Sequence, residues 1–481
     1  MAKEFAGRPL TPTDWRVLLV VAAAAVLLTA WVQHNGFFWD NVLLASRYGQ
    51  WYYDTHLTTL FAPDAIAVGY PTLFAYGLAT WWTITHKTLA ASHWLMLPGL
   101  LTIGWQALRL VRRYVPTAQL GAAVALVLLD PTLLGQAALV APDIYLVAWY
   151  LAALNALLDD RRGWLAVYLV GMALLSMRGT IMGGAVLGTE ILLWLVRPAN
   201  RRERPEWSRL WAYVPWLVAS ASWIGLYYAH YGWVLYRHTG AWAPGSERVG
   251  MVGALRNVGL IGWRLLDMGR VVIWLVAIGL VGRLWRQRQW PEPSRELAAL
   301  AAAPLLAMSV VVVGYANPIG HRYYLVVYLL VALWVAQQLA TLAPARRWAA
   351  YGCCLLGLLS GHFWVYPDRI AKGWDASLAH LPYFELRRVM LAELAARQIP
   401  LAAVGSDYPN AYPLRYPDLS HDSRQFASKD LRTNRYVLHS NVMNGFSDEE
   451  LAELATRWRL LREVRGGQVY FRLYERPMAG N

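Results

Sequence analysis

The sequence Gly36-Phe37-Phe38-Trp39-Asp40-Asn41 directly follows a hydrophobic run from about Trp15 to Trp31. A run of that length and composition predicts a helix that crosses a membrane. The polar and aromatic segment after it carries further acids, including Asp54, and ends in the turn Tyr70-Pro71-Thr72-Leu73. We expect a membrane protein with carboxylates at the outer end of its first span to carry out chemistry there.

The composition of the whole chain also indicates a membrane protein. Of its 481 residues, 57% are hydrophobic and 15% are charged, whereas a soluble protein has about a quarter charged residues. The 26 tryptophans and 27 tyrosines fit residue types that gather at membrane–water interfaces. The net charge of +14 would suit a nucleic-acid partner. Because the arginines lie mostly between apolar runs, we instead expect membrane lipids as the partner and no nucleic acid.

The apolar runs predict an α-helical polytopic membrane protein with about eleven transmembrane helices, since each span needs about 20 apolar residues. Arginines recur at alternate connections, as at Arg112, Arg161, Arg201 and Arg346. This pattern predicts a protein of the cytoplasmic (inner) membrane with a cytoplasmic N-terminus. The first run has no small-residue cleavage site, so we expect a retained span. The predicted spans are 15–33, 90–110, 117–134, 138–158, 163–178, 180–197, 210–229, 269–285, 296–314, 322–341 and 348–365.

Two domains are expected. Residues 1–366 form the transmembrane domain, with long outer loops at 34–89 and 230–268, and residues 367–481 form a small extracytoplasmic α/β domain. In the first outer loop we predict interfacial helices near 42–53 and 72–85. In the second domain we predict a helix at 385–398, strands at 401–406 and 435–439, a helix from Ser447 to Arg457, and a hairpin of 460–464 and 468–474.

Two aspartates are catalytic candidates. Asp40 lies at the outer end of the first span, where a carboxylate can act as general base toward an acceptor hydroxyl or amine. The alternative is an aspartate that caps the helix starting near Asn41. Asp143 follows Pro142 at the outer end of the fourth span, on the same side of the membrane. An acid beside a first-turn proline is also a good helix start, so both interpretations of Asp143 stay open.

Four arginines are candidates for binding an anion at the outer face. Arg178 lies between two spans, where a cation is costly unless it binds a phosphate or pairs with an acid such as Asp143. Arg322 opens a late span and is suited to bidentate phosphate contacts, with snorkelling to head groups as the alternative. Arg256 and Arg264 lie in the second outer loop. That loop either binds an anionic ligand or lies on lipid head groups as an amphipathic helix.

Several motifs are missing from the sequence. It contains no Walker A motif, no cluster of Cys or His with metal-ligand spacing, and no nucleotide-binding glycine pattern. An ATP or nucleotide-sugar site is therefore not expected. If the protein is an enzyme, its energy must come from an activated substrate within the membrane.

The order of these pieces resembles the GT-C fold glycosyltransferases, especially the protein O-mannosyltransferases and aminoarabinose transferases. That family has an acidic motif after the first span, a proline turn leading into an amphipathic helix, a leucine-proline entry into span two, a Pro, Gln and Asp pattern after span three, a basic-glycine pair after span five, and an Arg-Tyr pair at a late span. The matching positions are Asp40-Asn41, Tyr70-Pro71-Thr72-Leu73, Trp94–Pro98, Pro131 with Gln136 and Asp143, Arg178-Gly179, and Arg322-Tyr323.

The resemblance implies a glycosyltransferase that moves a hexose or pentose from a polyprenyl-phosphate donor to an acceptor lipid, glycan or protein outside the cytoplasm. Asp40 would be the general base, and Asp143 would orient the acceptor or pair with a cation. The positions implied to contact the donor phosphate are Arg178, Arg322, and Arg256 or Arg264. Further substrate-site candidates are Asn41, Asp54, Tyr70 and Tyr323.

The sequence departs from the family at two of these positions. Asn41 replaces an acidic residue, so a divalent metal cofactor stays open, and we expect metal-independent or weakly metal-dependent transfer. Tyr70 replaces a His or Lys that would contact the donor. Three alternatives remain from the sequence: a transporter or flippase for a lipid-linked glycan, a glycan ligase or polymerase that uses a pyrophosphate carrier, and a non-catalytic scaffold for the C-terminal domain.

Overall fold

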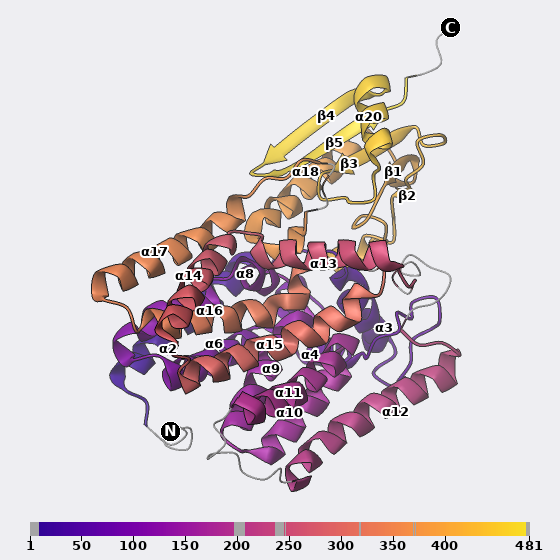
Figure 1. Cartoon of the computed structure of the whole chain (residues 1–481). Coiled ribbons are helices and arrows are strands. Elements are labelled where there is room, and N and C mark those ends of the chain that lie inside the picture. The colour runs from indigo at the N-terminus through magenta and orange to yellow at the C-terminus, as the bar shows by residue number, and fades with distance from the viewer. Residues whose placement is uncertain are drawn as a thin grey trace.

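The computed structural model describes residues 9–196, 207–235, 245, 247–316, 319–368, 370 and 372–477. The connection predicted around Arg201 lies outside them. Figure 1 shows a large bundle of helices from the first three-quarters of the chain, with a small sheet from the C-terminal quarter at one end. Helix α13 (Met251–Leu266) lies at the end of the bundle that faces the sheet.

The bundle contains a helix within each predicted span. Its elements in order are α2 (Pro12–Val32), η1 (Val42–Arg47), α3 (Tyr48–Asp54), α4 (Leu73–Thr85), α5 (Leu89–Trp94), α6 (Leu97–Tyr114), η2 (Thr117–Gln119), α7 (Leu120–Leu128), α8 (Pro131–Ala137), α9 (Pro142–Leu158), α10 (Arg162–Leu175), α11 (Met177–Val196), η4 (Trp207–Tyr213), α12 (Val214–Tyr231), α13 (Met251–Leu266), α14 (Val271–Gln287), α15 (Glu292–Val313), η6 (His321–Tyr324), α16 (Leu325–Leu339), α17 (Pro344–Ser360) and η7 (Gly361–Phe363). Elements η1, α3 and α4 confirm the two predicted helices of the first outer loop.

In the described part of the chain, fewer helices than the predicted eleven meet the length and composition needed to cross a membrane. Within the described residues, five helices are long and apolar enough to cross a membrane, or up to seven if each bent pair counts as one span. The predicted count of eleven is therefore not confirmed. The range 117–134 is broken, with a bend of 68° between Thr117–Leu128 and Pro131–Ala137. Asp130 causes this break, because its backbone is extended before a proline and its carboxylate accepts from Thr132 N and Leu133 N at 2.9 and 3.2 Å.

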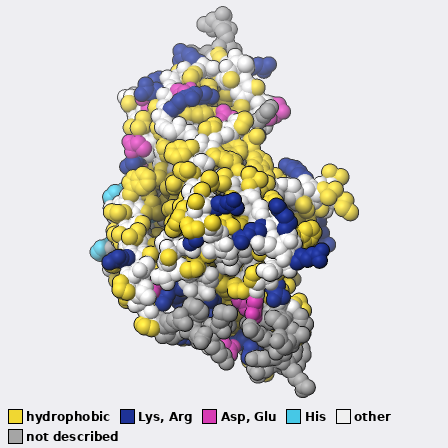
Figure 2. All heavy atoms as spheres, turned by 60° about the vertical axis from the view of Figure 1, so that its left-hand side comes forward, with side chains coloured by type: hydrophobic (Ala, Val, Ile, Leu, Met, Phe, Trp, Pro, Cys, Tyr) yellow, Lys and Arg dark blue, Asp and Glu magenta, His cyan; other side chains and the backbone are white. Residues whose placement is uncertain are grey.

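The outer surface of the bundle carries the apolar side chains of an integral membrane protein. Leu19, Leu27, Leu275 and Ile278 on α2 and α14 are all more than half exposed. Figure 2 shows hydrophobic side chains gathered across the middle of one face, with Lys and Arg side chains beside them and toward the C-terminal end. Such a surface is stable where lipid tails cover it.

The C-terminal elements form a mixed five-stranded sheet of order β2-β1-β3-β5-β4. The two pairs that join β1 to its neighbours are parallel, and β3-β5-β4 is antiparallel. Ser447 and Glu450 form the capping box of α20, which confirms the predicted helix start. The predicted hairpin is confirmed as β4 and β5, whereas the short β2 was not predicted. The elements are η8 (Trp374–Ala376), η9 (Leu378–His380), α18 (Pro382–Ala396), η10 (Leu401–Ala403), β1 (Val404–Ser406), α19 (Arg415–Asp418), β2 (Ala427–Ser428), β3 (Tyr436–Ser440), α20 (Asp448–Arg457), β4 (Arg459–Gly466) and β5 (Val469–Glu475).

Helix α8 holds the C-terminal elements against the bundle. A Cβ at Gly135 would lie 2.7 Å from the backbone oxygen of Asp375, so only a glycine lets α8 and η8 approach this closely. Gln136 donates to the same backbone oxygen at 3.0 Å. Phe38 of the first outer loop packs among His380, Tyr383 and Phe384. These contacts place Asp40 and Asp375 on the same side of the bundle.

Candidate functional site

Asp40 lies in a tight turn between α2 and η1. The preceding residue, Trp39, has a left-handed backbone with φ +50°, a conformation that is uncommon for a bulky residue and concentrates at functional sites. The Trp39 ring stacks on Tyr408 at a centroid distance of 5.2 Å. No side-chain cap is present at the start of η1. The Asp40 carboxylate instead accepts from Arg322 and, at 3.1 Å, from the Tyr408 hydroxyl. The helix-cap interpretation of Asp40 is therefore wrong.

Arg322 lies between two carboxylates. One Nη donates to Asp40 and the other donates to Asp375 Oδ2 at 3.0 Å. Gln136 Nε2 also donates to Asp375 Oδ2, at 3.1 Å. Asp40, Gln136 and Asp375 come from different parts of the chain. Tertiary packing, and not local sequence, therefore brings them together with Arg322.

A second ion pair joins Asp143 to Arg178. Asp143 lies in the first turn of α9 and accepts from both Nη atoms of Arg178, one of them at 3.1 Å. The Arg178 guanidinium lies over the Tyr323 ring, 5.0 Å from its centroid. Gly179 permits this placement, because a Cβ there would lie 1.8 Å from the backbone oxygen of Met172. Of the alternatives left open by the sequence, pairing between these two residues is the one observed.

The two ion pairs form one cluster. Arg322 interacts electrostatically with Asp143 as well as with Asp40 and Asp375, and Arg178 and Arg322 repel each other. Three carboxylates thus face two guanidinium groups. The Asp40 side chain is 28% exposed, whereas Asp143 is 3% exposed and bonded through both oxygens. Asp40 is therefore the more accessible carboxylate for an acceptor, whereas Asp143 is the ion-pair partner of Arg178.

Tyr408 extends the cluster toward the C-terminal sheet. Burial and the negative charge of Asp40 hold the pKa of the Tyr408 phenol well above its usual value. The hydroxyl therefore stays protonated and donates to Asp40. Tyr412 lies edge-on to Tyr408 at 6.3 Å, and the Arg47 guanidinium lies 5.7 Å from the Tyr412 ring centroid. Arg47, at the end of the π-helical η1, is thus a further cation near this side of the site.

Three other predicted substrate-site residues have surroundings of their own. Asn41 is buried, and its Nδ2 has no hydrogen-bond partner among the described residues. Asp54 is exposed at the end of α3 and pairs with Lys87 at 3.4 Å. Tyr70 follows Gly69, whose N–H donates to the Tyr227 hydroxyl at 2.9 Å. The roles of these three residues in substrate binding stay predictions.

The two arginines of the second outer loop have different surroundings. Arg256 is exposed on α13, where Met251, Val252 and Leu255 are also exposed. This helix meets α14 at 94° and lies across the bundle, as an amphipathic interfacial helix does (Figure 1). Arg264 turns inward, and its Nε donates to the backbone oxygen of Ile319 at 2.9 Å. Neither arginine belongs to the cluster within the described part of the chain.

Sequence reasoning missed Asp375 and Tyr408, and it noted Gln136 only as part of a family pattern. No local motif marks Asp375, which lies in the short helix η8, or Tyr408, which lies in a loop after β1. Only the packing of η8 on α8 and of Tyr408 on Trp39 identifies them. Among the described residues, no group of three or more His, Cys, Asp or Glu side chains is placed to hold a metal ion.

The sequence matches no protein-family model and no curated protein sequence. The structure, however, is similar to ArnT from Cupriavidus metallidurans bound to undecaprenyl phosphate, with a TM-score of 0.54 and 13% identity over 96% of this chain and 98% of that chain. The same protein in the apo state gives a TM-score of 0.53 and 15% identity over the same shares. The arabinofuranosyltransferase AftD from Mycobacteria aligns with a TM-score of 0.47 and 14% identity, over 97% of this chain and 40% of that chain. The likeness to ArnT over nearly the whole of both chains shows that this integral membrane protein has the GT-C fold.

Proposed function

We propose that this protein is a glycosyltransferase that moves a sugar from a polyprenyl-phosphate donor to an acceptor on the outer face of the cytoplasmic membrane. The observation that carries the proposal is the Asp40–Arg322 contact at the outer end of the first helix. It places a partly exposed carboxylate beside a guanidinium group in a fold shared with a protein bound to undecaprenyl phosphate. The N-terminus would then be cytoplasmic, and residues 367–481 would form an extracytoplasmic domain.

In the proposed reaction, Asp40 accepts the proton of an acceptor hydroxyl or amine. The acceptor atom forms a bond to the anomeric carbon while the bond from that carbon to the phosphate oxygen breaks. Polyprenyl phosphate leaves with the electron pair, and the configuration at the anomeric carbon is inverted. General-base help of this kind contributes about 10²–10⁴-fold in rate.

Arg322 and Arg178 are proposed to stabilise the leaving phosphate. Preorganised charge aimed at a leaving group is often the largest single catalytic contribution. Arg322 forms ion pairs with Asp40 and Asp375. Phosphate oxygens that reach Arg322 compete with Asp40 for the same donor atoms. We therefore propose that donor binding loosens the Asp40–Arg322 contact and frees Asp40 for the acceptor.

The acceptor would reach Asp40 from the side of the C-terminal domain. A cavity of about 270 Å³ lies there and is lined by residues that include Phe37, Tyr383, Arg387 and Pro409. Phe37 and Pro409 belong to the segments that carry Asp40 and Tyr408. Its aromatic and charged walls suit a polar acceptor group with an apolar face.

The proposal is tested by supplying polyprenyl-phosphate-linked pentose and hexose donors to membranes that contain the protein. Released polyprenyl phosphate and glycosylated acceptor are measured by mass spectrometry, with membranes lacking the protein as control. Protein-dependent release together with a new glycoside supports the transferase. Movement of intact donor across the bilayer without cleavage would instead support a flippase.

A further inference from the structure

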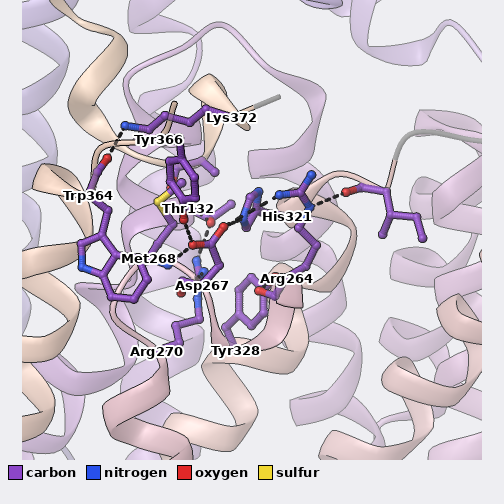
Figure 3. A network of polar contacts seen from close by, with 12 residues as sticks. Thr132, Arg264, Asp267, Met268, Arg270, His321, Tyr328, Trp364, Tyr366 and Lys372 are labelled. Carbon is purple, nitrogen blue, oxygen red and sulfur yellow. Dashed lines mark hydrogen bonds and ion pairs between the residues drawn. The ribbon is translucent and has the colours of Figure 1, made fainter. Parts of the chain in front are cut away.

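A buried polar network centred on Asp267 lies behind Arg322. Figure 3 shows Asp267 at the corner between α13 and α14, between the side chains of His321 and Tyr366. His321 Nε2 lies 2.6 Å from Asp267 Oδ2, and the Tyr366 hydroxyl and the Met268 N–H both donate to Oδ1. Asp267 and His321 are each 1% exposed. A buried network of this kind is worth little for stability by itself, and its best-attested use is to fix one arrangement among several.

The His321 contact controls the turn that carries Arg322. Both residues belong to the 3₁₀ helix η6, where neighbouring side chains point about 120° apart. His321 therefore turns inward to Asp267 while Arg322 points to the ion cluster. Arg264 reinforces this arrangement, because it donates to the Ile319 backbone just before η6 and lies 3.8 Å from Asp267 Oδ2.

The same corner also holds the segment that carries Asp375. Arg270 donates to both oxygens of Asp130 at 2.6 and 2.9 Å, and it also donates to Thr132 on α8. Its Nη1 donates to the backbone oxygen of Asp267 at 3.1 Å. Thr132 Oγ1 in turn donates to the backbone oxygen of Ala376 at 3.3 Å, and Gln136, also on α8, donates to Asp375. The corner at residues 267–270 is thus connected to both sides of the Arg322–Asp375 contact.

The segment that carries Arg322 and the segment that carries Asp375 are also in direct contact close to this ion pair. A Cβ at Gly373 would lie 2.6 Å from His321 Nδ1 and 3.0 Å from its Cε1. The imidazole ring therefore lies against the backbone two residues before Asp375. A displacement of His321 would move Arg322 and the turn at residues 373–376 relative to each other.

We infer that Asp267 and His321 are positioning residues, which fix Arg322 against Asp375 and thereby aim its guanidinium group at the donor phosphate. The phosphate part of this inference rests on the proposed function, whereas the geometry of the Arg322–Asp375 contact does not. Tyr366 brings the segment after α17 to the same carboxylate. We therefore expect the network to affect phosphate binding through the Arg322–Asp375 contact, which it supports from both sides.

The test uses Gly373→Ala, which pushes on the His321 ring and removes no polar group. Gly282→Ala is its matched control, because nothing lies within 4 Å of a Cβ built at Gly282. The affinity of the purified full-length protein for undecaprenyl phosphate is measured by tryptophan fluorescence for these variants, for Arg322→Ala, and for the double variant G373A/R322A. Tyr366→Phe serves as a second probe of the network if Gly373→Ala fails to fold.

We expect Arg322→Ala to weaken binding by about tenfold or more, Gly373→Ala to weaken it by several-fold, and Gly282→Ala to bind like the wild type. The double variant should bind like Arg322→Ala, because the effect of Gly373→Ala passes through Arg322. Where Arg322→Ala does weaken binding, the inference is overturned if Gly373→Ala binds like the wild type, or if it weakens binding equally with and without Arg322.

A structure of the Gly373→Ala protein separates this inference from the proposed function. We expect the Arg322 Nη1 to Asp375 Oδ2 distance of 3.0 Å to lengthen beyond hydrogen-bond range. If that contact stays intact, the positioning role is wrong whatever the activity. If the contact breaks but Arg322→Ala binds undecaprenyl phosphate like the wild type, the positioning role stands and the donor-phosphate role of Arg322 is wrong.

Discussion

Arg322 and Asp375 form a 3.0 Å contact between the turn that opens α16 and the short helix η8 after the last bundle helix. Through this contact the C-terminal elements contribute a carboxylate to the same cation that binds Asp40. The C-terminal region is therefore part of the candidate site, and its residues are expected to affect substrate binding.

Asp375→Asn keeps an amide oxygen that can accept from Arg322, so it should leave the guanidinium group in place and strengthen the binding of undecaprenyl phosphate at low ionic strength. The cluster contains three carboxylates and two guanidinium groups. Removal of one negative charge therefore makes anion binding at the cluster more favourable. For charges about 6 Å apart at an effective dielectric constant near 20, the Coulomb energy is about 3 kcal/mol; salt and solvent at the site reduce it, so we expect a gain of about tenfold. The affinity is measured by titration at two salt concentrations, and the gain should shrink at the higher one. Weaker binding at both concentrations would contradict the prediction, because it would show that the contact with Arg322 depends on the charge of Asp375.

Asp143→Asn should destabilise the protein by about 3 kcal/mol, because it leaves the partly buried Arg178 without its charged partner. The unfolding midpoint in detergent is the measurement. Adding Arg178→Gln to Asp143→Asn should recover part of the loss, since the unpaired charge is then absent. Independent, additive losses would contradict a direct coupling between these two residues.

Lys372 gives the protein a pH-dependent stability on the alkaline side. Burial lowers the pKa of this lysine to about 8, whereas an unfolded chain keeps the proton up to about pH 10.4. Between these values the unfolded state binds more protons, so stability rises with pH, by about 3 kcal/mol in total. Unfolding of the wild type and of Lys372→Met is compared from pH 7.5 to 10.5. The difference between the two proteins should change across this window, and a constant difference would refute the shifted pKa.

His380 should make the stability of the protein depend on pH on the acidic side. Burial lowers its pKa to about 4, so between about pH 6.5 and 4 the unfolded chain takes up a proton that the folded protein does not. Stability therefore falls as the pH falls, by about 3 kcal/mol for this residue. His380→Gln should flatten that part of the stability profile, and the exposed His421, replaced in the same way, should not. Identical profiles for all three proteins would contradict the prediction.

Local sequence signals predicted most of the elements and part of the site. Apolar length located the bundle helices, and the Ser447–Glu450 capping box and the glycines between β4 and β5 located C-terminal elements. Asp40, Arg178 and Arg322 could be selected because a charged side chain beside a membrane span is energetically costly and often marks a functional site. The break at Asp130 falls inside the predicted span 117–134, because a window of apolar residues does not register one Asp-Pro pair.

The remaining parts of the site depend on contacts between distant segments. Asp375 and Tyr408 reach Arg322 and Asp40 only after η8 packs on α8 and Tyr408 stacks on Trp39. Arg264 was expected to bind phosphate, yet it supports the segment before η6, because the sequence does not show which side of an amphipathic helix a given arginine occupies. Long-range packing of this kind leaves no periodic or motif signal in a single sequence.

The most direct test of the central claim, that Asp40 is the general base, compares Asp40→Asn with the wild type in two measurements on the same purified protein. Turnover of a polyprenyl-phosphate-linked sugar should fall by about 10²–10⁴-fold, while the affinity for undecaprenyl phosphate should be unchanged or higher because one carboxylate near Arg322 is removed. Turnover at the wild-type rate by a folded Asp40→Asn protein would contradict the assignment of Asp40.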